Sequence, residues 1–393
     1  MHTLNRIAPS VQTAQRVPRY LSCLCCLLLL VSSATPAVEP IAPQVAAKSW
    51  LLVDYHSGRV LAEHAADERR EPASLTKLMT AYVLFKQLRA GKFSLDDKVP
   101  VSAKAWGMPG ARMYLRLNDK VSVEELIKGM LVQSGNDATL ALAEYVAGSE
   151  DQFVSLMNAE AATLGMQATH FANTTGLIQA EHYSTARDIN RLSIALMRDF
   201  PEDYQRWFGL KEFNYAGLTQ YNRNTLLWRV AGTDGVKTGH TRTAGFCLVA
   251  SALRDNMRLV ATLMGATSEK ARAEAGSTLL DFGFRAYETR LLYQSHAPSV
   301  HVRVWMGDME MLPAGIGQDI YLTLPRGDFA KLKANVLIPQ PPTAPIKTGD
   351  TIGQVHLTLD QQPLGDYPLL ALRTVQQGTL IQRLMDQLRL WLP

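Results

Sequence analysis

Ser74 and Lys77 are the first two residues in this chain whose types and spacing suit catalysis. In "EPASLTKLM" they lie three positions apart, so a helix would place both side chains on one face. Pro72 and Ala73 put the serine near a helix N-terminus, where backbone N–H groups favour a developing anion. A serine nucleophile needs a base, and lysine is one only when burial or nearby cations lower its pKa. Alone, this pattern is more typical of a solvated pair, so catalysis requires a second cation and relay groups elsewhere.

Two later tripeptides can supply those groups. "LVQSGNDA" contains Ser134–Asn136 at the junction of two expected helices, and "GVKTGH" contains Lys237–Gly239 on an expected strand edge. Separately, the first is typical of a turn and the second of a strand end. All three elements, in this order and context, are not a plausible accident, and together they predict one active site. A second KTG, at 347–349, follows a proline-rich stretch and is typical of a turn that leads into a strand.

The three elements resemble the signatures of serine penicillin-binding proteins and serine β-lactamases. The surrounding sequence narrows the resemblance to D-alanyl-D-alanine carboxypeptidases of the penicillin-binding protein 5 type. The segments that carry it are "PASLTKLMTAYV", "LVQSGNDA", "FANTTGL", "YSTARD", "DGVKTGHT", "AGFCLVASA", "RLVATLMG" and "YLTLPRG". The resemblance runs from about residue 40 to the end of the chain, and it includes a β domain and an amphipathic tail that this type uses as a membrane anchor.

The resemblance implies a catalytic role for each matching residue. Ser74 resembles the nucleophile that forms the acyl-enzyme, and Lys77 resembles the base that takes its proton. Ser134 resembles the relay that passes a proton to the leaving D-alanine. Asn136 is expected to bond Lys77 or the substrate amide.

The KTG segment is expected to bind substrate. Lys237 resembles the cation that keeps Lys77 neutral and attracts the terminal carboxylate of the substrate, and Thr238 resembles a residue that bonds this carboxylate. Gly239 completes the motif. The backbone N–H groups of Ser74 and His240 would form the oxyanion hole, whereas the His240 side chain is not expected to act as a base.

Two arginines match family positions near the substrate carboxylate or Thr238. They are Arg223 in "YNRNTLLW" and Arg272 in "EKARAEAG", and surface salt bridges are an equally good interpretation of each. The histidines lack metal-ligand spacing such as H-E-x-x-H, so neither a metal nor a cofactor is expected.

Apolar periodicity predicts an α+β fold for the first domain, which we place at residues 43–290. Residues 49–62 are typical of a hairpin, helical segments follow, and residues 235–266 are typical of two antiparallel strands joined at "RDNM". Because strands bracket the helices, we expect the first and last strands to share a sheet. The resemblance implies a serine β-lactamase/DD-peptidase-like domain, with an antiparallel sheet, flanking helices and a helical subdomain.

Residues 291–376 change to short alternating runs separated by Gly, Pro and Asp, which predicts a small all-β domain. Residues 378–393 form an amphipathic helix, too short to span a bilayer. Its expected apolar face consists of Leu380, Ile381, Leu384, Met385, Leu388 and Trp391. Such a helix can dock on the β domain or lie on a membrane surface, and we favour the membrane.

Residues 1–37 have the basic, apolar and small-residue order of a secretory signal peptide, with cleavage near 34–37. A buried core helix is the alternative. Export would leave Cys247 as the only cysteine, expected to be a buried packing residue. The net charge of +4 comes from scattered Lys and Arg, so no nucleic-acid partner is expected. We expect a periplasmic protein attached peripherally to the outer face of the cytoplasmic membrane.

The resemblance implies hydrolysis of the terminal D-Ala–D-Ala bond of peptidoglycan stem peptides and covalent inhibition by β-lactams. A DD-endopeptidase that cuts cross-linked peptidoglycan is the nearest alternative. A β-lactamase is less expected, because the chain lacks a Glu-x-x-Leu-Asn stretch after Ser134 and has an additional β domain. Intact motifs argue against a non-catalytic envelope scaffold.

Overall fold

The computed structural model describes residues 10–12 and 39–391. The signal peptide expected at residues 1–37 lies outside the described residues, apart from the short strand β1 (Ser10–Gln12), and stays a prediction. The chain divides into two compact units, Ile41–Ala286 and a second unit that contains Tyr287–Pro393. The sequence predicts this boundary after Arg290. It falls earlier because strand β11 (Tyr287–Tyr293) pairs with β14 (Ile320–Pro325) of the second unit.

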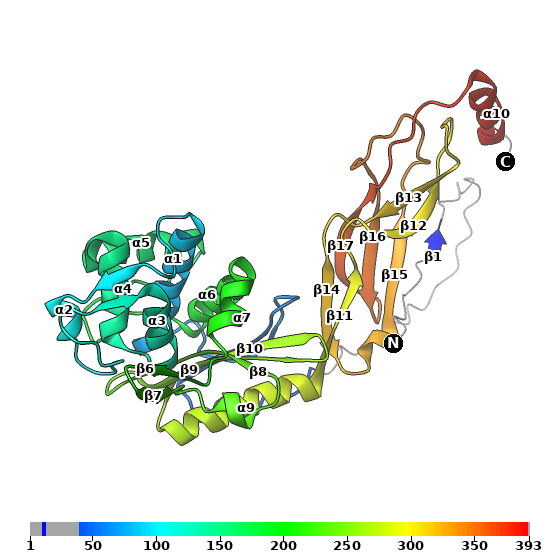
Figure 1. Ribbon diagram of the computed structural model, residues 1–393. Helices are drawn as coiled ribbons and strands as arrows, with labels where there is room; N and C mark the ends of the chain where they lie inside the picture. Colours follow the sequence, from blue (N-terminus) through cyan, green and yellow to red (C-terminus); the bar gives the residue numbers. More distant parts are fainter. Residues whose placement is uncertain (1–9, 13–38, 392–393) are drawn as a thin grey trace. The chain divides into compact units, whose positions relative to one another are not determined.

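A five-stranded antiparallel sheet forms the centre of the unit Ile41–Ala286 (Figure 1). Its strand order is β3-β2-β10-β9-β8, and the strands are β2 (Ser49–Asp54), β3 (Val60–His64), β8 (Thr233–Thr241), β9 (Gly245–Arg254) and β10 (Met257–Ala266). As predicted, strands from the two ends of the unit pair with each other, because β2 lies beside β10. The prediction of two strands in residues 235–266 was wrong. A turn at 242–244 separates β8 from β9, so there are three.

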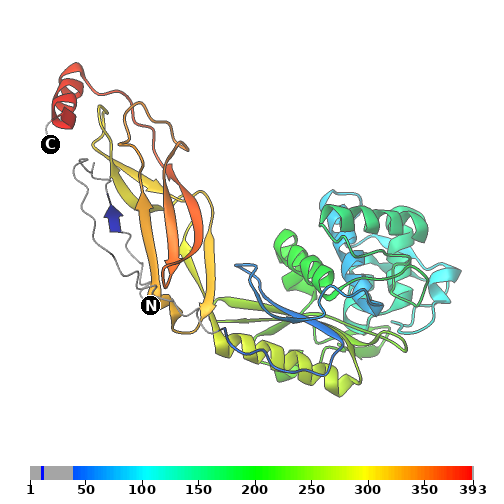
Figure 2. The same cartoon turned by 180° about the vertical axis from the view of Figure 1, so that it is seen from behind.

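Helices cover both faces of this sheet. The long helix α9 (Glu269–Ala286) packs on one face, and α6 (Ala186–Asp199) packs on the other (Figures 1 and 2). Because both faces are covered, β2 and β10 are buried along almost their whole length, and their sequences are nearly continuous apolar runs rather than alternating ones.

The remaining elements of this unit form the helical subdomain and its connections. The helices are η1 (Ala73–Thr76), α1 (Lys77–Arg89), α2 (Ala103–Trp106), α3 (Val123–Lys128), η2 (Gly129–Gln133), α4 (Asn136–Ala147), α5 (Glu150–Thr163), α7 (Pro201–Trp207) and α8 (Leu226–Arg229). Two small two-stranded sheets pair β4 (Lys98–Pro100) with β5 (Lys120–Ser122) and β6 (Glu212–Tyr215) with β7 (Leu218–Tyr221). Helix α1 packs against α4, α5 and α6, so the helix that follows Ser74 is central to the core.

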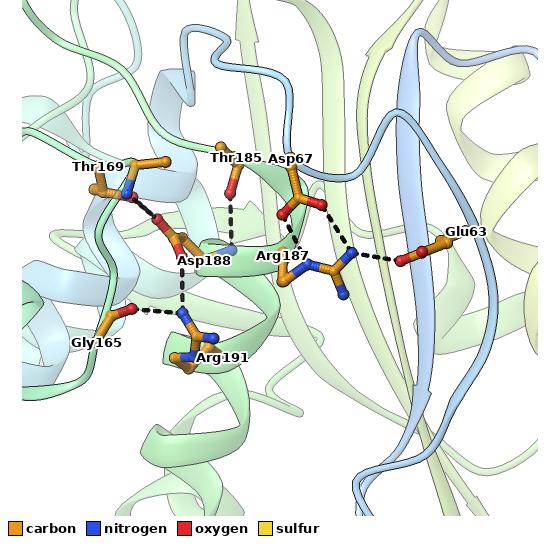
Figure 3. A network of polar contacts seen from close by, with 9 residues as sticks. Glu63, Asp67, Gly165, Thr169, Thr185, Arg187, Asp188 and Arg191 are labelled. Carbon is orange, nitrogen blue, oxygen red and sulfur yellow. Dashed lines mark hydrogen bonds and ion pairs between the residues drawn. The ribbon is translucent and has the colours of Figure 1, made fainter.

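A polar network holds the start of α6 (Figure 3). The Thr185 hydroxyl caps the helix by accepting a hydrogen bond from the Asp188 backbone N–H. The Asp188 carboxylate accepts from the Thr169 hydroxyl at 2.8 Å and pairs with Arg191 at 2.9 Å. Arg187 pairs with Asp67, in the segment that follows β3. The loop that precedes α6 is therefore anchored at its end.

The second unit is built from β-strands, as predicted. A six-stranded sheet has the order β1-β15-β16-β17-β13-β12, and β11 and β14 form a separate two-stranded sheet. Its further elements are β12 (Pro298–Arg303), β13 (Met311–Gly315), η3 (Asp328–Lys331), β15 (Leu332–Leu337), β16 (Thr351–Leu359) and β17 (Gln362–Ala371). The second KTG lies in a turn before β16, where the Lys347 backbone N–H donates to the Asp350 carboxylate and Gly349 has φ +91°.

The terminal helix α10 (Leu380–Trp391) is present. The Asp386 carboxylate accepts a hydrogen bond from the Met306 backbone N–H at 2.8 Å. The described apolar side chains of α10 are exposed, from Leu390 at 40% to Ile381 at 75%. Over the described parts of the chain, no helix has the length and apolar character needed to cross a bilayer.

Candidate active site

Ser74 lies on η1, a short 3-10 helix that continues directly into α1. The preceding residue, Ala73, has φ +48°, in the left-handed region that residues other than glycine seldom adopt. Ser74 is partly exposed, whereas Ala73, Leu75 and Thr76 are buried. The sequence expectation of a serine at a helix N-terminus is confirmed, with a strained residue before it.

Lys77 is fully buried, and three acceptors surround its ammonium group. Its Nζ atom lies 3.1 Å from Ser74 Oγ, 2.7 Å from Asn136 Oδ1 and 2.7 Å from the Thr175 carbonyl oxygen. The contact with Ser74 is the one expected from their spacing. The contact with Asn136 joins side chains that come from two different helices.

The pKa of Lys77 is lowered to about 7: burial is the largest cause, the positive charge of Arg223 adds to the lowering, and the negative charge of Asp137 acts in the opposite direction. The resemblance had assigned this lowering to Lys237. In the structure burial is the largest cause, and Arg223 is the cation that adds to it. A lysine with this pKa is substantially neutral near pH 7, so it can accept the proton of an adjacent hydroxyl.

Ser134 lies at the end of η2, a π-helical turn that interrupts the expected helix pair. It has φ +65°, also in the left-handed region, and α4 begins two residues later at Asn136. π-Helical turns are rare and are often found at functional sites. This one turns the Ser134 hydroxyl towards the sheet, where it accepts a hydrogen bond from Lys237 Nζ at 2.9 Å.

Lys237, Thr238 and Gly239 lie on β8, the edge strand of the sheet. Lys237 is buried, and its Nζ also donates to the Thr238 carbonyl at 2.9 Å. Burial lowers the pKa of Lys237 well below its ordinary value, and the charges of Lys77, Arg223 and Arg272 lower it further.

His240 ends the strand segment that faces the site. It is exposed, and its ring stacks on Phe246 with 4.1 Å between centroids. The stacking engages the face of the ring and not its nitrogens, so the expectation that this side chain is not the base stays a prediction.

The two arginines differ in their surroundings. Arg223 is exposed, and it acts on Lys77 and Lys237 through its charge. Arg272 is buried and pairs with Glu269 at 2.8 Å. Arg272 also donates to the Arg223 carbonyl at 3.2 Å, so it supports the segment that carries Arg223.

Sequence reasoning missed two groups that hold the site together. The Thr175 carbonyl, which accepts from Lys77, is a backbone group without a side-chain signal. Asp137 is buried and accepts hydrogen bonds from the backbone N–H groups of Met113, Tyr114 and Leu115, which ties another loop to the start of α4. An acidic residue in the first turn of a helix was the one available hint for Asp137.

The described residues contain no group of three or more His, Cys, Asp or Glu side chains arranged to hold a metal ion. Cys247 is free and buried, and burial raises the pKa of its thiol to about 11, which suits a packing role. The arrangement of Ser74, Lys77 and Ser134 can therefore support acyl transfer through a serine ester with proton transfer by lysine.

Comparisons with known proteins identify the class of this arrangement. Residues 36–268 match the D-alanyl-D-alanine carboxypeptidase family, and residues 287–377 match the C-terminal domain of penicillin-binding protein 5. The fold is that of the serine DD-peptidases and β-lactamases, as predicted from the motifs. The chain belongs to the D-alanyl-D-alanine carboxypeptidase family, and it is a hydrolase of the serine carboxypeptidase type.

Individual relatives agree over most of the chain. D-alanyl-D-alanine carboxypeptidase DacC of Escherichia coli is 42% identical over 369 residues, which cover 92% of each chain. DacA of the same organism is 41% identical over 359 residues, or 89% of each chain. Penicillin-binding protein 5 from Haemophilus influenzae has a structure with a TM-score of 0.79 and 37% identity, covering 87% of this chain and 100% of that one.

Proposed function

We propose that this protein removes the terminal D-alanine from peptidoglycan stem pentapeptides through an acyl-enzyme on Ser74. The observation that carries the proposal is the 3.1 Å contact between Ser74 Oγ and Lys77 Nζ, together with the lowering of the Lys77 pKa to about 7. A hydroxyl beside a neutral, buried amine is an activated nucleophile.

In the acylation step, Ser74 Oγ attacks the carbonyl carbon of the penultimate D-alanine and Lys77 takes the hydroxyl proton. The carbonyl oxygen becomes an anion, which the backbone N–H groups of Ser74 and His240 stabilise. The C–N bond then breaks, and the leaving D-alanine nitrogen needs a proton. The Ser134 hydroxyl, which accepts a hydrogen bond from Lys237, gives its proton to this nitrogen and takes the proton held by Lys77, so that Lys77 is neutral again before deacylation.

Lys237 and Thr238 bind the terminal carboxylate of the substrate. Burial holds the pKa of Lys237 well below the ordinary value. A bound carboxylate favours the charged form of the lysine, so substrate binding and protonation of Lys237 support each other. The edge position of β8 leaves backbone groups that can pair with an extended peptide.

Deacylation returns the enzyme to its starting state. Water attacks the ester carbonyl, Lys77 accepts the water proton, and Ser74 recovers its hydroxyl hydrogen as the ester bond breaks. A β-lactam acylates Ser74 by the same attack, but its amine stays tethered to the acyl group after ring opening. This tethering obstructs the water, and the enzyme is inhibited.

We also propose that the protein is exported to the periplasm and attached peripherally to the cytoplasmic membrane through α10. The exposed apolar side chains of this helix support the proposal, because the Asp386 contact with Met306 engages the polar side and leaves the apolar side free.

Two assays on the purified protein test the function. Fluorescent penicillin should label it covalently, and Ser74→Ala should abolish labelling. Diacetyl-Lys-D-Ala-D-Ala should release D-alanine. Labelling of Ser74→Ala at full stoichiometry would remove Ser74 as the nucleophile, and cleavage of cross-linked dimers alone would favour an endopeptidase.

A further inference from the structure

The peptide group between Ala73 and Ser74 has two atoms with different tasks. Its N–H belongs to Ser74 and is one of the two proposed oxyanion-hole donors. Its carbonyl oxygen belongs to Ala73. Because a trans peptide is planar, with its N–H and C=O pointing in opposite directions, the direction of one bond determines the direction of the other. Whatever holds the Ala73 carbonyl therefore aims the Ser74 N–H.

The surrounding backbone does not favour this peptide orientation by itself. Ala73 has φ +48°, and an alanine in the left-handed region costs about 1–2 kcal/mol relative to ordinary backbone. Such a conformation persists only when neighbouring groups impose it.

A chain of hydrogen bonds imposes it, and the direction of each bond is determined by the groups involved. The Ala172 backbone N–H donates to His182 Nδ1 at 3.0 Å, so this nitrogen carries no proton. In the neutral imidazole the proton is then on Nε2, which lies 2.8 Å from Thr76 Oγ1 and donates to it. The Thr76 hydroxyl in turn donates to the Ala73 carbonyl at 2.8 Å.

The surroundings of His182 keep it neutral and in place. Its exposed fraction is 4%, and burial lowers its pKa to about 4, with the charges of His170 and Lys77 adding to the effect. The loop that carries His182 is anchored at Ser184, whose hydroxyl lies 2.7 Å from the Thr169 hydroxyl. The imidazole is therefore a stationary donor.

The space around the Ala73 carbonyl leaves it little freedom. Gly176, with φ +83°, packs so closely that a Cβ atom there would lie 1.8 Å from the Ala73 oxygen and 2.8 Å from Thr76 Oγ1. The carbonyl is held between the Thr76 hydroxyl and the Gly176 backbone.

We propose that His182 and Thr76 are positioning residues that orient the Ser74 N–H for the oxyanion hole. This inference rests on the proposed acyl-enzyme at Ser74, and it adds His182 and Thr76 as the side chains that orient the Ser74 backbone N–H. His182 acts only through Thr76 and the Ala73 peptide, and it takes no proton from the substrate. The oxyanion exists in the transition state and not in the bound substrate. The hydrogen bonds from His182 through Thr76 to Ala73 should therefore affect the rate of acylation rather than the binding of substrate.

Three substitutions test the hydrogen bonds among His182, Thr76 and Ala73 one at a time. Thr76→Val removes the hydroxyl at nearly constant volume. His182→Asn puts an amide oxygen near the place of Nδ1, which keeps the bond from Ala172 and loses the donor to Thr76. His182→Gln puts an amide N–H near the place of Nε2 and restores that donor. The experiment measures the first-order acylation constant and the binding constant for benzylpenicillin by stopped-flow mixing on the full chain.

We expect Thr76→Val and His182→Asn to slow acylation by about 10- to 100-fold with little change in the binding constant. We expect His182→Gln to stay within about threefold of the wild-type rate, and the double variant Thr76→Val/His182→Asn to be no slower than either single one. An acylaminomethylboronic acid, whose tetrahedral adduct puts an oxygen in the oxyanion hole, should bind more weakly to the two slow variants.

The opposite outcomes would overturn the inference. Wild-type acylation in Thr76→Val would show that the hydroxyl does not aim the Ser74 N–H, even if the histidine variants fail to fold. Equal losses in His182→Gln and His182→Asn would reduce His182 to a packing residue. These results differ from failure of the proposed function, in which Ser74→Ala would still be acylated by penicillin.

Discussion

Gly239 lies directly against the backbone of Ser74: a Cβ atom at Gly239 would be 3.0 Å from the Ser74 nitrogen and 3.0 Å from the Pro72 carbonyl oxygen. The glycine of the KTG motif is therefore the point at which strand β8 meets the turn that carries the nucleophile. A side chain at this position would separate the two proposed oxyanion-hole donors, Ser74 and His240.

Gly239→Ala should consequently slow acylation of Ser74 by penicillin by about 10-fold or more, because a displacement of a fraction of an ångström already misplaces catalytic groups. The second-order acylation constant is the measurement. Gly349→Ala in the other KTG is the matched control, since a Cβ there meets nothing within 4 Å. Its positive φ should cost some stability and leave acylation unchanged, and equal rates in both variants would contradict the steric argument.

The two KTG lysines should behave differently when replaced by alanine. Lys237→Ala removes the cation bonded to Ser134 and should lower acylation by about 100-fold or more. Lys347→Ala changes an exposed turn residue and should alter the free energy of unfolding by no more than about 0.5 kcal/mol. Release of D-alanine from diacetyl-Lys-D-Ala-D-Ala and thermal unfolding report the two effects. A larger loss of activity at Lys347 would mean that the site has been assigned to the wrong unit.

The acylation rate should rise with pH through about 7, where Lys77 loses its proton. Arg223 lowers the pKa of Lys77, so Arg223→Ala should raise this pKa and move the rising limb of the pH profile to higher pH. The pH dependence of the acylation constant tests this shift. Arg229→Ala, which removes an arginine that is not among the charges acting on Lys77, should leave the limb in place. If Arg223→Ala leaves the rising limb of the pH profile in place, this arginine does not affect the pKa of Lys77.

Deleting residues 378–393 should abolish binding to phosphatidylglycerol-containing vesicles and leave D-alanine release unchanged, because the catalytic groups all lie within Ile41–Ala286. In the full chain, Leu384→Asp puts a charge on the exposed apolar face and should weaken sedimentation with vesicles. Gln382→Asp adds the same charge on the polar side of α10, one turn before Asp386, and is the control. Equal sedimentation of wild type and Leu384→Asp would remove the helix as the membrane contact.

Much of the fold was accessible from periodicity. The hairpin β2–β3, the sheet shared by strands from both ends of the first unit, the β-rich second unit and the terminal helix all follow from apolar patterns. The separation of β8 from β9 was not predicted, because the turn at 242–244 has the sequence Arg-Thr-Ala and contains none of the Gly, Pro, Asn or Asp residues that usually mark a turn. The π-helical turn at 129–133 was missed as well, since its residues fit an ordinary helical pattern.

The sequence by itself determined the candidate residues of the site, because their types and spacing form recognisable motifs. These residues are Ser74, Lys77, Ser134 and Lys237. Only the tertiary structure decided the chemistry available to them. The pKa of Lys77 depends on its burial and on Arg223, a residue 146 positions away (223 − 77) whose proximity no local pattern encodes. The same is true of three other contacts: the Thr175 carbonyl accepts from Lys77, the His182 imidazole bonds Thr76, and Gly176 packs against the Ala73 carbonyl. Such contacts form when segments that are distant in the sequence meet in the fold, and no local sequence pattern predicts them.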